Sequence, residues 1–206
     1  MDDSAVHIFW DNSNVFARAQ DTCDDRQGGG IEPGEHTNVR INFRGMFEFA
    51  RAGRSVEKAV AIGSVPPDLA ELWEKLGNVG MVVGLQERGA QSGKEVAVDE
   101  ALKLAMLESV IDREPPAVAV LLSGDGGYRS TLDRLLKRGW GVEVLSFSKG
   151  LSPKLVQIAH GTGGRGKYVK LDPWYNQLTY RQELLDTGPH VVRQSEPLDI
   201  ARRPKV

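Results

Sequence analysis

Short runs of apolar residues alternate along the chain with longer segments in which apolar residues recur every three or four positions. The short runs are typical of buried strands, and the longer segments are typical of amphipathic helices. The pattern predicts strands over residues 6–10, 56–63, 79–84, 117–123, 141–147 and 168–171. It predicts helices over residues 39–52, 68–76, 96–113, 129–138 and 153–159. This alternation indicates a three-layer α/β/α fold, in which helices cover both faces of a mainly parallel sheet.

Three aspartates stand where buried segments begin or end. Asp11 and Asp125 each follow a predicted strand, and Asp99 lies near the start of the helix over 96–113. Open α/β sheets bind their ligands at the C-terminal ends of strands. Three carboxylates about 4 Å apart would repel one another by about 4 kcal/mol per pair at an effective dielectric constant near 20, so such a cluster calls for a cation. Ligand sets made only of oxygen favour Mg²⁺ or Mn²⁺ over zinc.

Composition bounds the class of protein. The 206 residues are one domain's worth, and we expect a domain over 1–172 followed by a helical segment and a flexible tail over 173–206. A formal charge of −2 gives no overall basic surface for nucleic acid. The single cysteine, Cys23, excludes an internal disulfide and a cysteine-based zinc site. With neither a signal peptide nor a membrane span in the pattern, we expect a cytoplasmic protein.

Two polar segments lie close in sequence to Asp11 and Asp99. Residues 20–37 are rich in glycine and are either a lid over the first strand or a disordered excursion. Residues 86–94 contain turn-forming pairs just before the helix of Asp99, and Lys94 there is a candidate phosphate contact. A solvated charge on a loop remains the alternative for Lys94.

Five segments, taken in order and spacing, resemble a known family. They are WDNSNV, INFRGMFEFA, VAVDEALKLAML, VLLSGDGGYRSTLDRLLKRGWGVEVLSF and SPKLVQIAHG. They are similar to the NYN domain, a branch of the PIN-like ribonuclease superfamily, over roughly residues 5–172. The resemblance implies a PIN-like, Rossmann-like fold whose acidic residues bind divalent cations and whose usual substrate is RNA. It implies catalytic and metal-binding roles for Asp11, Asp99 and Asp125.

The chain departs from the family pattern at the last aspartate. Gly127 stands where the family usually carries a second aspartate, and Tyr128 stands where it usually carries phenylalanine. Fewer carboxylates lower the affinity for a hard cation, so we expect one metal ion or a weak second one. Asn14 is a candidate for supplying a carbonyl ligand to the metal or for holding a metal-bound water. Glu95 and Glu100 flank Asp99 closely enough to replace the missing carboxylate.

Further polar residues are candidates for binding a substrate phosphate. Glycines after the strand over 117–123 let backbone N–H groups approach an anion at a helix start. The substrate-binding candidates are Asn14, Arg44, Lys94, Ser123, Gly126, Arg129 and Ser130. For the two arginines a structural ion pair is an equally good interpretation, and a serine in a first helical turn is more often a cap. His7 is expected to be buried and hydrogen-bonded, and Trp10 either stacks a base or packs in the core.

These residues favour a metal-dependent endoribonuclease that hydrolyses RNA phosphodiester bonds. The alternative is a PIN-like module, weakened at Gly127, that binds RNA or a protein partner without cutting. A phosphatase that forms an aspartyl intermediate ranks last, because Ser13 stands where it needs a second aspartate. RNA is the expected partner and a membrane is not. The segment WYNQLTYRQELL is equally suited to packing on a second copy, which leaves a homo-oligomer open.

Overall fold

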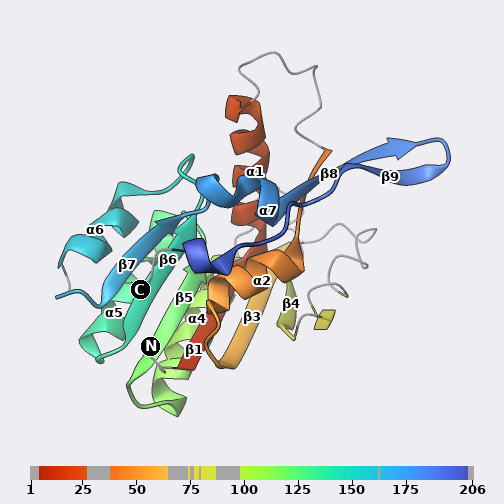
Figure 1. The fold of residues 1–206 in the computed structure, drawn as a ribbon. Coiled ribbons are helices and arrows are strands. Elements are labelled where there is room, and N and C mark those ends of the chain that lie inside the picture. The colour runs from red at the N-terminus through yellow and green to blue at the C-terminus, as the bar shows by residue number, and fades with distance from the viewer. Residues whose placement is uncertain are drawn as a thin grey trace, which may run out of the picture.

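A six-stranded parallel sheet forms the centre of the molecule. The computed structural model describes residues 5–26, 38–64, 74, 77, 78, 80–86, 98–161 and 163–203. The strands lie in the order β4-β3-β1-β5-β6-β7, and each runs parallel to its neighbours (Figure 1). They span Ala5–Asp11 (β1), Val56–Ser64 (β3), Val82–Gln86 (β4), Ala117–Leu122 (β5), Gly141–Ser146 (β6) and Gly166–Lys170 (β7). Each predicted strand overlaps one of these, and the α/β fold class is confirmed.

Strands β1 and β5 lie in the middle of the sheet because their sequences are almost wholly apolar. Every residue of both strands is buried. A parallel strand covered on both faces needs apolar side chains on both, which gives a continuous apolar run. His7 is buried within β1, and its imidazole is 3.2 Å from a carboxylate oxygen of Glu57. It is therefore a buried, hydrogen-bonded histidine, as the sequence suggested.

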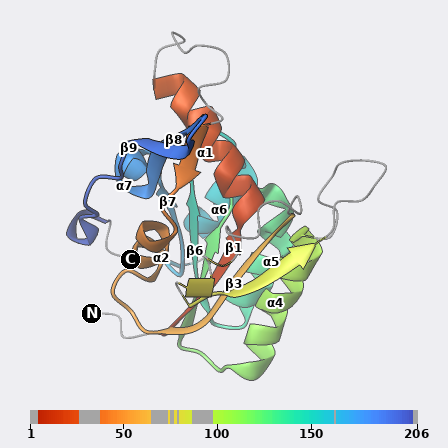
Figure 2. The same ribbon diagram turned by 90° about the vertical axis from the view of Figure 1, so that its right-hand side faces the viewer.

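Helices cover both faces of this sheet and complete three layers. They span Asn12–Arg26 (α1), Phe43–Arg51 (α2), Val98–Asp112 (α4), Arg129–Lys137 (α5), Pro153–Gly161 (α6) and Tyr175–Leu178 (α7). Apolar side chains of α1, α2 and α7 pack in one core cluster with one face of β1. Those of α4, α5 and α6 pack in a second cluster on the other face. Figure 2 shows α2 and α7 on one side of the strands and α4 on the other.

Two predicted elements differ from the observed ones near the N-terminus. Residues 20–26, expected in a mobile loop, belong to helix α1, while residues 27–37 lie outside the described residues. The helix expected over 39–52 is instead the short strand β2 (Val39–Ile41) followed by α2. The side chain of Asn42 explains the break, because its Oδ1 accepts the N–H of Gly45 at 3.0 Å and caps the helix there. The predicted helix 68–76 lies almost wholly outside the described residues.

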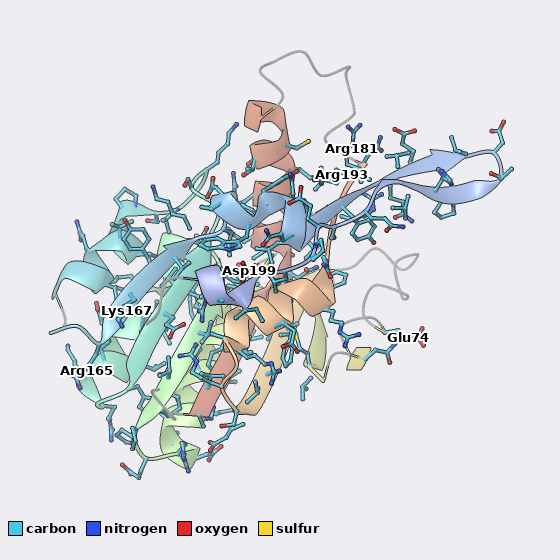
Figure 3. The ribbon with its side chains drawn as sticks, in the orientation of Figure 1. Glu74, Arg165, Lys167, Arg181, Arg193 and Asp199 are labelled. Atoms are coloured by element: carbon cyan, nitrogen blue, oxygen red, sulfur yellow. The ribbon has the colours of Figure 1, made fainter. Side chains whose placement is uncertain are left out.

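The C-terminal segment contains strands where a helical segment and tail were expected. Strands β8 (Thr179–Leu185) and β9 (Gly188–Arg193) form an antiparallel hairpin, and β8 also pairs with β2. The hairpin projects from the body, and Arg181 and Arg193 lie together at its base (Figure 3). Neither strand alternates strictly between polar and apolar residues, and β9 is largely exposed, so the sequence carries only a weak signal for this hairpin.

The chain then returns to the body through a buried ion cluster. Arg203 is 4 % exposed, and its Nη2 donates to Glu143 Oε2 at 2.7 Å. Arg54 donates to both oxygens of the same carboxylate, at 2.6 and 3.0 Å. Arg203 also lies over the ring of Phe49, 5.2 Å from its centroid. We call Arg54, Glu143 and Arg203 the C-terminal clasp, because they fasten the end of the described chain to strand β6.

Candidate active site

Three aspartates meet at one edge of the parallel sheet. Asp11 is the last residue of β1, and Asp125 comes just after the neighbouring parallel strand β5. Asp99 lies in the first turn of α4, which packs against β1 and β3. The fold therefore gathers three carboxylates that lie far apart in the sequence. They gather at the edge where open α/β sheets bind ligands.

Asp11 is the most deeply buried of the three, with 3 % of its surface exposed. Its Oδ1 accepts the backbone N–H of Asn14 at 3.1 Å, and its Oδ2 accepts the hydroxyl of Ser123 at 3.1 Å. Oδ2 also lies 3.3 Å from the hydroxyl oxygen of Tyr128. A carboxylate removed from water needs such donors to remain ionised. Donors of the chain itself therefore hold both oxygens of Asp11 in place.

The hydroxyl of Tyr128 connects Asp11 with Asp99. It donates to Asp99 Oδ1 at 2.9 Å, and its ring is wholly buried in the cluster under α4 and α5. Burial raises the pKa of Tyr128 far above its ordinary value, and the negative charges of Asp11 and Asp99 raise it further. The hydroxyl therefore keeps its proton at every physiological pH. Because it carries a single proton, it donates to one of the two carboxylates at a time.

Asp125 stands at the solvent-facing side of the site. Its side chain is exposed, and its Oδ1 accepts the N–H of Gly127 at 2.7 Å, which caps the 3₁₀ turn that follows. Its own N–H donates to the hydroxyl of Ser123 at 3.1 Å. The preceding N–H, that of Gly124, donates to Asn14 Oδ1 at 2.9 Å. This network fixes the backbone that carries Asp125 relative to Asp11.

Gly127 lies beside the carboxylates of Asp99 and Asp125. A Cβ built on Gly127 would lie 3.3 Å from Asp125 Oδ1 and 3.6 Å from Asp99 Oδ2. A side chain there would enter the space between the two carboxylates, and this is the position at which the family pattern has its further aspartate. Among the described residues, neither Asp99 Oδ2 nor Asp125 Oδ2 accepts a hydrogen bond. Asp99 Oδ2 and Asp125 Oδ1 thus flank the position at which glycine carries no side chain.

The loop after β6 packs against the same turn. The N–H of Ser152 donates to the carbonyl of Gly124 at 2.9 Å. A Cβ on Gly126 would lie 3.4 Å from Cδ of Lys154, so the Lys154 side chain runs past the residue that follows Asp125. Lys154 is exposed, and within the described part of the chain its ammonium group forms no ion pair. It is a cation close to the acidic edge that the sequence did not single out.

The substrate-binding candidates fall into different positions. Asn14 and Ser123 hold the aspartates and the loop through hydrogen bonds. Arg129 is committed to Asp133 at 2.8 Å and to the carbonyl of Lys154, which favours its structural interpretation.

The other candidates lie on the surface, in the turn or beyond the described residues. Ser130 is exposed in the first turn of α5, and Gly126 lies in the turn itself. Arg44 is exposed at the start of α2, and no hydrogen bond or ion pair between described residues joins it to the aspartates. Lys94 and Glu95 lie outside the described residues. The predicted binding roles of these residues stay predictions.

Two further sequence expectations concern aromatic and acidic residues. Trp10 is wholly buried, and its ring lies 5.6 Å from that of Phe43, so it packs in the core. Glu100 is exposed and pairs with Lys103 at 2.9 Å on the surface of α4. No hydrogen bond or ion pair between described residues joins the Glu100 carboxylate to those of the three aspartates. The residue that the sequence pointed to only as a departure, Tyr128, is the one that touches two of the three aspartates.

The fold and site together define a class of protein: a three-layer α/β domain with carboxylates gathered at the C-terminal edge of a parallel sheet. Over residues 5–162 the chain matches the model of the NYN domain, and it belongs to that family. NYN domains are PIN-like nucleases that in general act on RNA, and PIN-like nucleases generally use divalent metals. The suspected family is therefore confirmed.

A solved structure supports the fold. A protein of unknown function from Vibrio parahaemolyticus is 19 % identical, with a TM-score of 0.59, and the match covers 83 % of this chain and 95 % of that one. Identity this low speaks for the fold alone. Within the described ranges no group of three or more histidine, cysteine, aspartate or glutamate residues is close enough to hold a metal ion, and no helix is long and apolar enough to cross a membrane.

Proposed function

We propose that this protein is a metal-dependent endoribonuclease that hydrolyses RNA phosphodiester bonds at Asp11, Asp99 and Asp125. The observation that carries the proposal is the gathering of these carboxylates around Tyr128 and Gly127, at the sheet edge where this fold binds its ligands. A purely structural role would not require two exposed or half-exposed carboxylates to face a common open space. Membership of a nuclease family gives that space its chemical interpretation.

The residues present fit a divalent ion held by few protein ligands. Mg²⁺ dehydrates reluctantly, and it commonly binds through one or two carboxylates together with waters and substrate phosphates. Asp99 and Asp125 offer such a pair across the space at Gly127. The ion would be Mg²⁺ or Mn²⁺, because all the side-chain donors at this space are oxygens. When bound, it would polarise a phosphate oxygen and lower the pKa of a water molecule.

The remaining residues position the Asp11 carboxylate and the RNA substrate. The N–H of Asn14 and the hydroxyls of Ser123 and Tyr128 hold the Asp11 carboxylate beside the site, where its negative charge would favour a cation. Lys154, exposed and without an ion pair among the described residues, would contact a phosphate that neighbours the one being cut, since its side chain runs past Gly126. Burial of Asp11 and Tyr128 limits the access of water to one side of the acidic group.

The test is cleavage of a panel of labelled single-stranded and structured RNAs, with Mn²⁺, Mg²⁺ or EDTA. Asp125→Asn removes the exposed carboxylate and should abolish cleavage. The matched control is Asp112→Asn at the far end of α4, where the carboxylate is exposed, and it should cut at the wild-type rate. Wild-type cleavage that persists in EDTA, or that survives Asp125→Asn, would refute the proposal.

A second candidate function rests on Gly127, where the family's further carboxylate is absent. Without it, the domain would bind RNA or a protein partner and leave it intact. The same RNA panel separates the two functions when binding is measured alongside cleavage. Binding of RNA that is unchanged by EDTA, together with intact RNA under every metal, would favour the binding module.

A further inference from the structure

The position of the Tyr128 hydroxyl bears on which carboxylates a cation can reach, an inference that rests on the proposed metal-dependent function. The hydroxyl oxygen lies 2.9 Å from Asp99 Oδ1 and 3.3 Å from Asp11 Oδ2. A divalent cation bound directly to both of these oxygens would compete with the Tyr128 hydroxyl, because the hydroxyl already contacts the same two atoms.

The hydroxyl has no easy route out of that region. The Tyr128 ring is 0 % exposed and packs among the apolar side chains of α4, α5 and the central strands. Interiors of proteins are close-packed, so moving such a ring would require neighbouring side chains to move with it. The adjoining turn is fixed as well, because Asp125 caps it through the N–H of Gly127.

Both carboxylate oxygens of Asp11 already accept hydrogen bonds from the protein. Its Oδ1 is held by the N–H of Asn14, and its Oδ2 by the Ser123 hydroxyl, in addition to the contact with Tyr128. Only 3 % of the residue is exposed. In contrast, Asp99 is half-buried and Asp125 is exposed. Asp99 Oδ2 lies near Gly127 and accepts no hydrogen bond from a described residue. Asp125 Oδ1 accepts the N–H of Gly127, and its Oδ2 accepts no hydrogen bond from a described residue.

We propose that Tyr128 is a positioning residue that keeps Asp11 from ligating the metal, so that a divalent cation binds to Asp99 and Asp125 in front of Gly127. Asp11 then acts on the ion through space and through the Tyr128 hydroxyl. Phenylalanine, the usual residue of the family pattern at this position, carries no hydroxyl that could donate to Asp11 or Asp99. One oxygen atom thus changes which carboxylates form the metal site.

The experiment measures Mn²⁺ binding to the full chain by calorimetry, without RNA. Asp125→Asn and Asp99→Asn should each weaken binding at least tenfold, because each removes a ligand. Asp11→Asn should weaken it about threefold at most, because its charge is felt only through space. Tyr128→Phe should tighten binding about tenfold, because the ion no longer competes with a hydrogen bond to a carboxylate, and tenfold corresponds to about 1.4 kcal/mol.

A double-mutant cycle gives the decisive readout. In the Tyr128→Phe background, Asp11→Asn should remove the tenfold gain, because Asp11 then becomes a ligand. Tyr168→Phe removes a hydroxyl from a half-buried tyrosine on β7 and serves as the matched control, with unchanged Mn²⁺ affinity. Circular dichroism and the melting temperature in EDTA establish that each variant is folded.

Three results would overturn the inference. They are an unchanged or weaker Mn²⁺ affinity in folded Tyr128→Phe, a loss of binding in Asp11→Asn as large as that in Asp125→Asn, and no binding to any variant at millimolar Mn²⁺. Failure of the ribonuclease proposal is a separate outcome, because it is read from RNA cleavage. The expected binding pattern with uncut RNA supports the role of Tyr128 and refutes only the nuclease.

Discussion

Replacing Glu143 by glutamine should destabilise the protein strongly, although the change keeps the shape of the side chain. Glu143 is 1 % exposed and accepts three hydrogen bonds, two from Arg54 and one from Arg203. Glutamine removes the negative charge and leaves two guanidinium groups close together in the interior. Burial itself lowers the pKa of Arg203, and the charge of Glu143 opposes that shift. Without the charge of Glu143, burial and the neighbouring charge of Arg54 both disfavour the protonated form of Arg203, and nothing opposes them.

The expected loss is large for a single isosteric change. Removing one partner from a buried ion pair costs about 3–5 kcal/mol, because the remaining charge has lost its compensation. Arg54 retains some contact with solvent at 10 % side-chain exposure, while Arg203 has only 2 %, so we expect about 3 kcal/mol. In a chain of this length each kcal/mol lowers the melting temperature by about 2–4 °C. The midpoint should therefore fall by about 6–12 °C.

Urea unfolding followed by circular dichroism measures this free energy. The matched control is Glu48→Gln, which breaks the 2.8 Å pair with Arg51 on the surface of α2, where both side chains are about one-third exposed. Exposed pairs contribute about 0–1 kcal/mol, so this variant should unfold close to the wild type. A Glu143→Gln protein that loses less than about 1 kcal/mol would show that the clasp is not a source of stability, and would refute the reasoning.

Two further predictions concern the acidic edge and the histidine in β1. Gly127→Asp places a third carboxylate between Asp99 and Asp125, so its melting temperature in EDTA should fall below that of the wild type, and Mn²⁺ should raise it by more than it raises the wild type's. An equal Mn²⁺ shift in both proteins would contradict this. Burial lowers the pKa of His7 despite the opposing effect of Glu57, so the unfolded chain takes up a proton before the folded one does. Stability should therefore decrease as the pH falls from about 7 to about 5, and by less in His7→Gln; identical pH profiles of the two unfolding free energies would exclude this role.

Much of the fold could be predicted because its central elements carry strong patterns. Strands β1 and β5 are uninterrupted apolar runs, and the sequence places Asp11 and Asp125 directly after them. Helix α4 was foreseen from its apolar spacing. The motifs that carry the family resemblance lie in these same buried segments, and buried segments are where sequence constrains structure most.

Elements with weaker apolar patterns were missed. Helix α1 is largely polar and buries a narrow stripe that includes Val15, Ala19 and Cys23, which is short of a clear amphipathic pattern. Strand β2 has only three residues and depends on pairing with β8, which lies far away in the sequence. Pairing between distant segments leaves little trace in the local pattern of either segment.

The arrangement at the site could be predicted only in part. The sequence shows a tyrosine at position 128, but it does not show that its hydroxyl reaches Asp11, 117 positions away. Nor does it show that Arg129 is engaged with Asp133 and the carbonyl of Lys154, while the ammonium group of Lys154 forms no ion pair in the described part of the chain. These contacts depend on how α5 packs against α6 and against the 3₁₀ turn Gly126–Tyr128.

The C-terminal clasp also bears on how freely this protein can change. Arg54 of the clasp lies in the turn just before β3 begins, and therefore at the opposite end of the parallel strands from the acidic edge. Mutations that alter reactivity at one end therefore need not weaken the attachment that secures the chain at the other. A domain divided in this way can tolerate a change of carboxylate at the acidic edge, such as Gly127→Asp, and still fold. The end of the molecule that carries the proposed chemistry can therefore vary while the attachment at the other end stays the same.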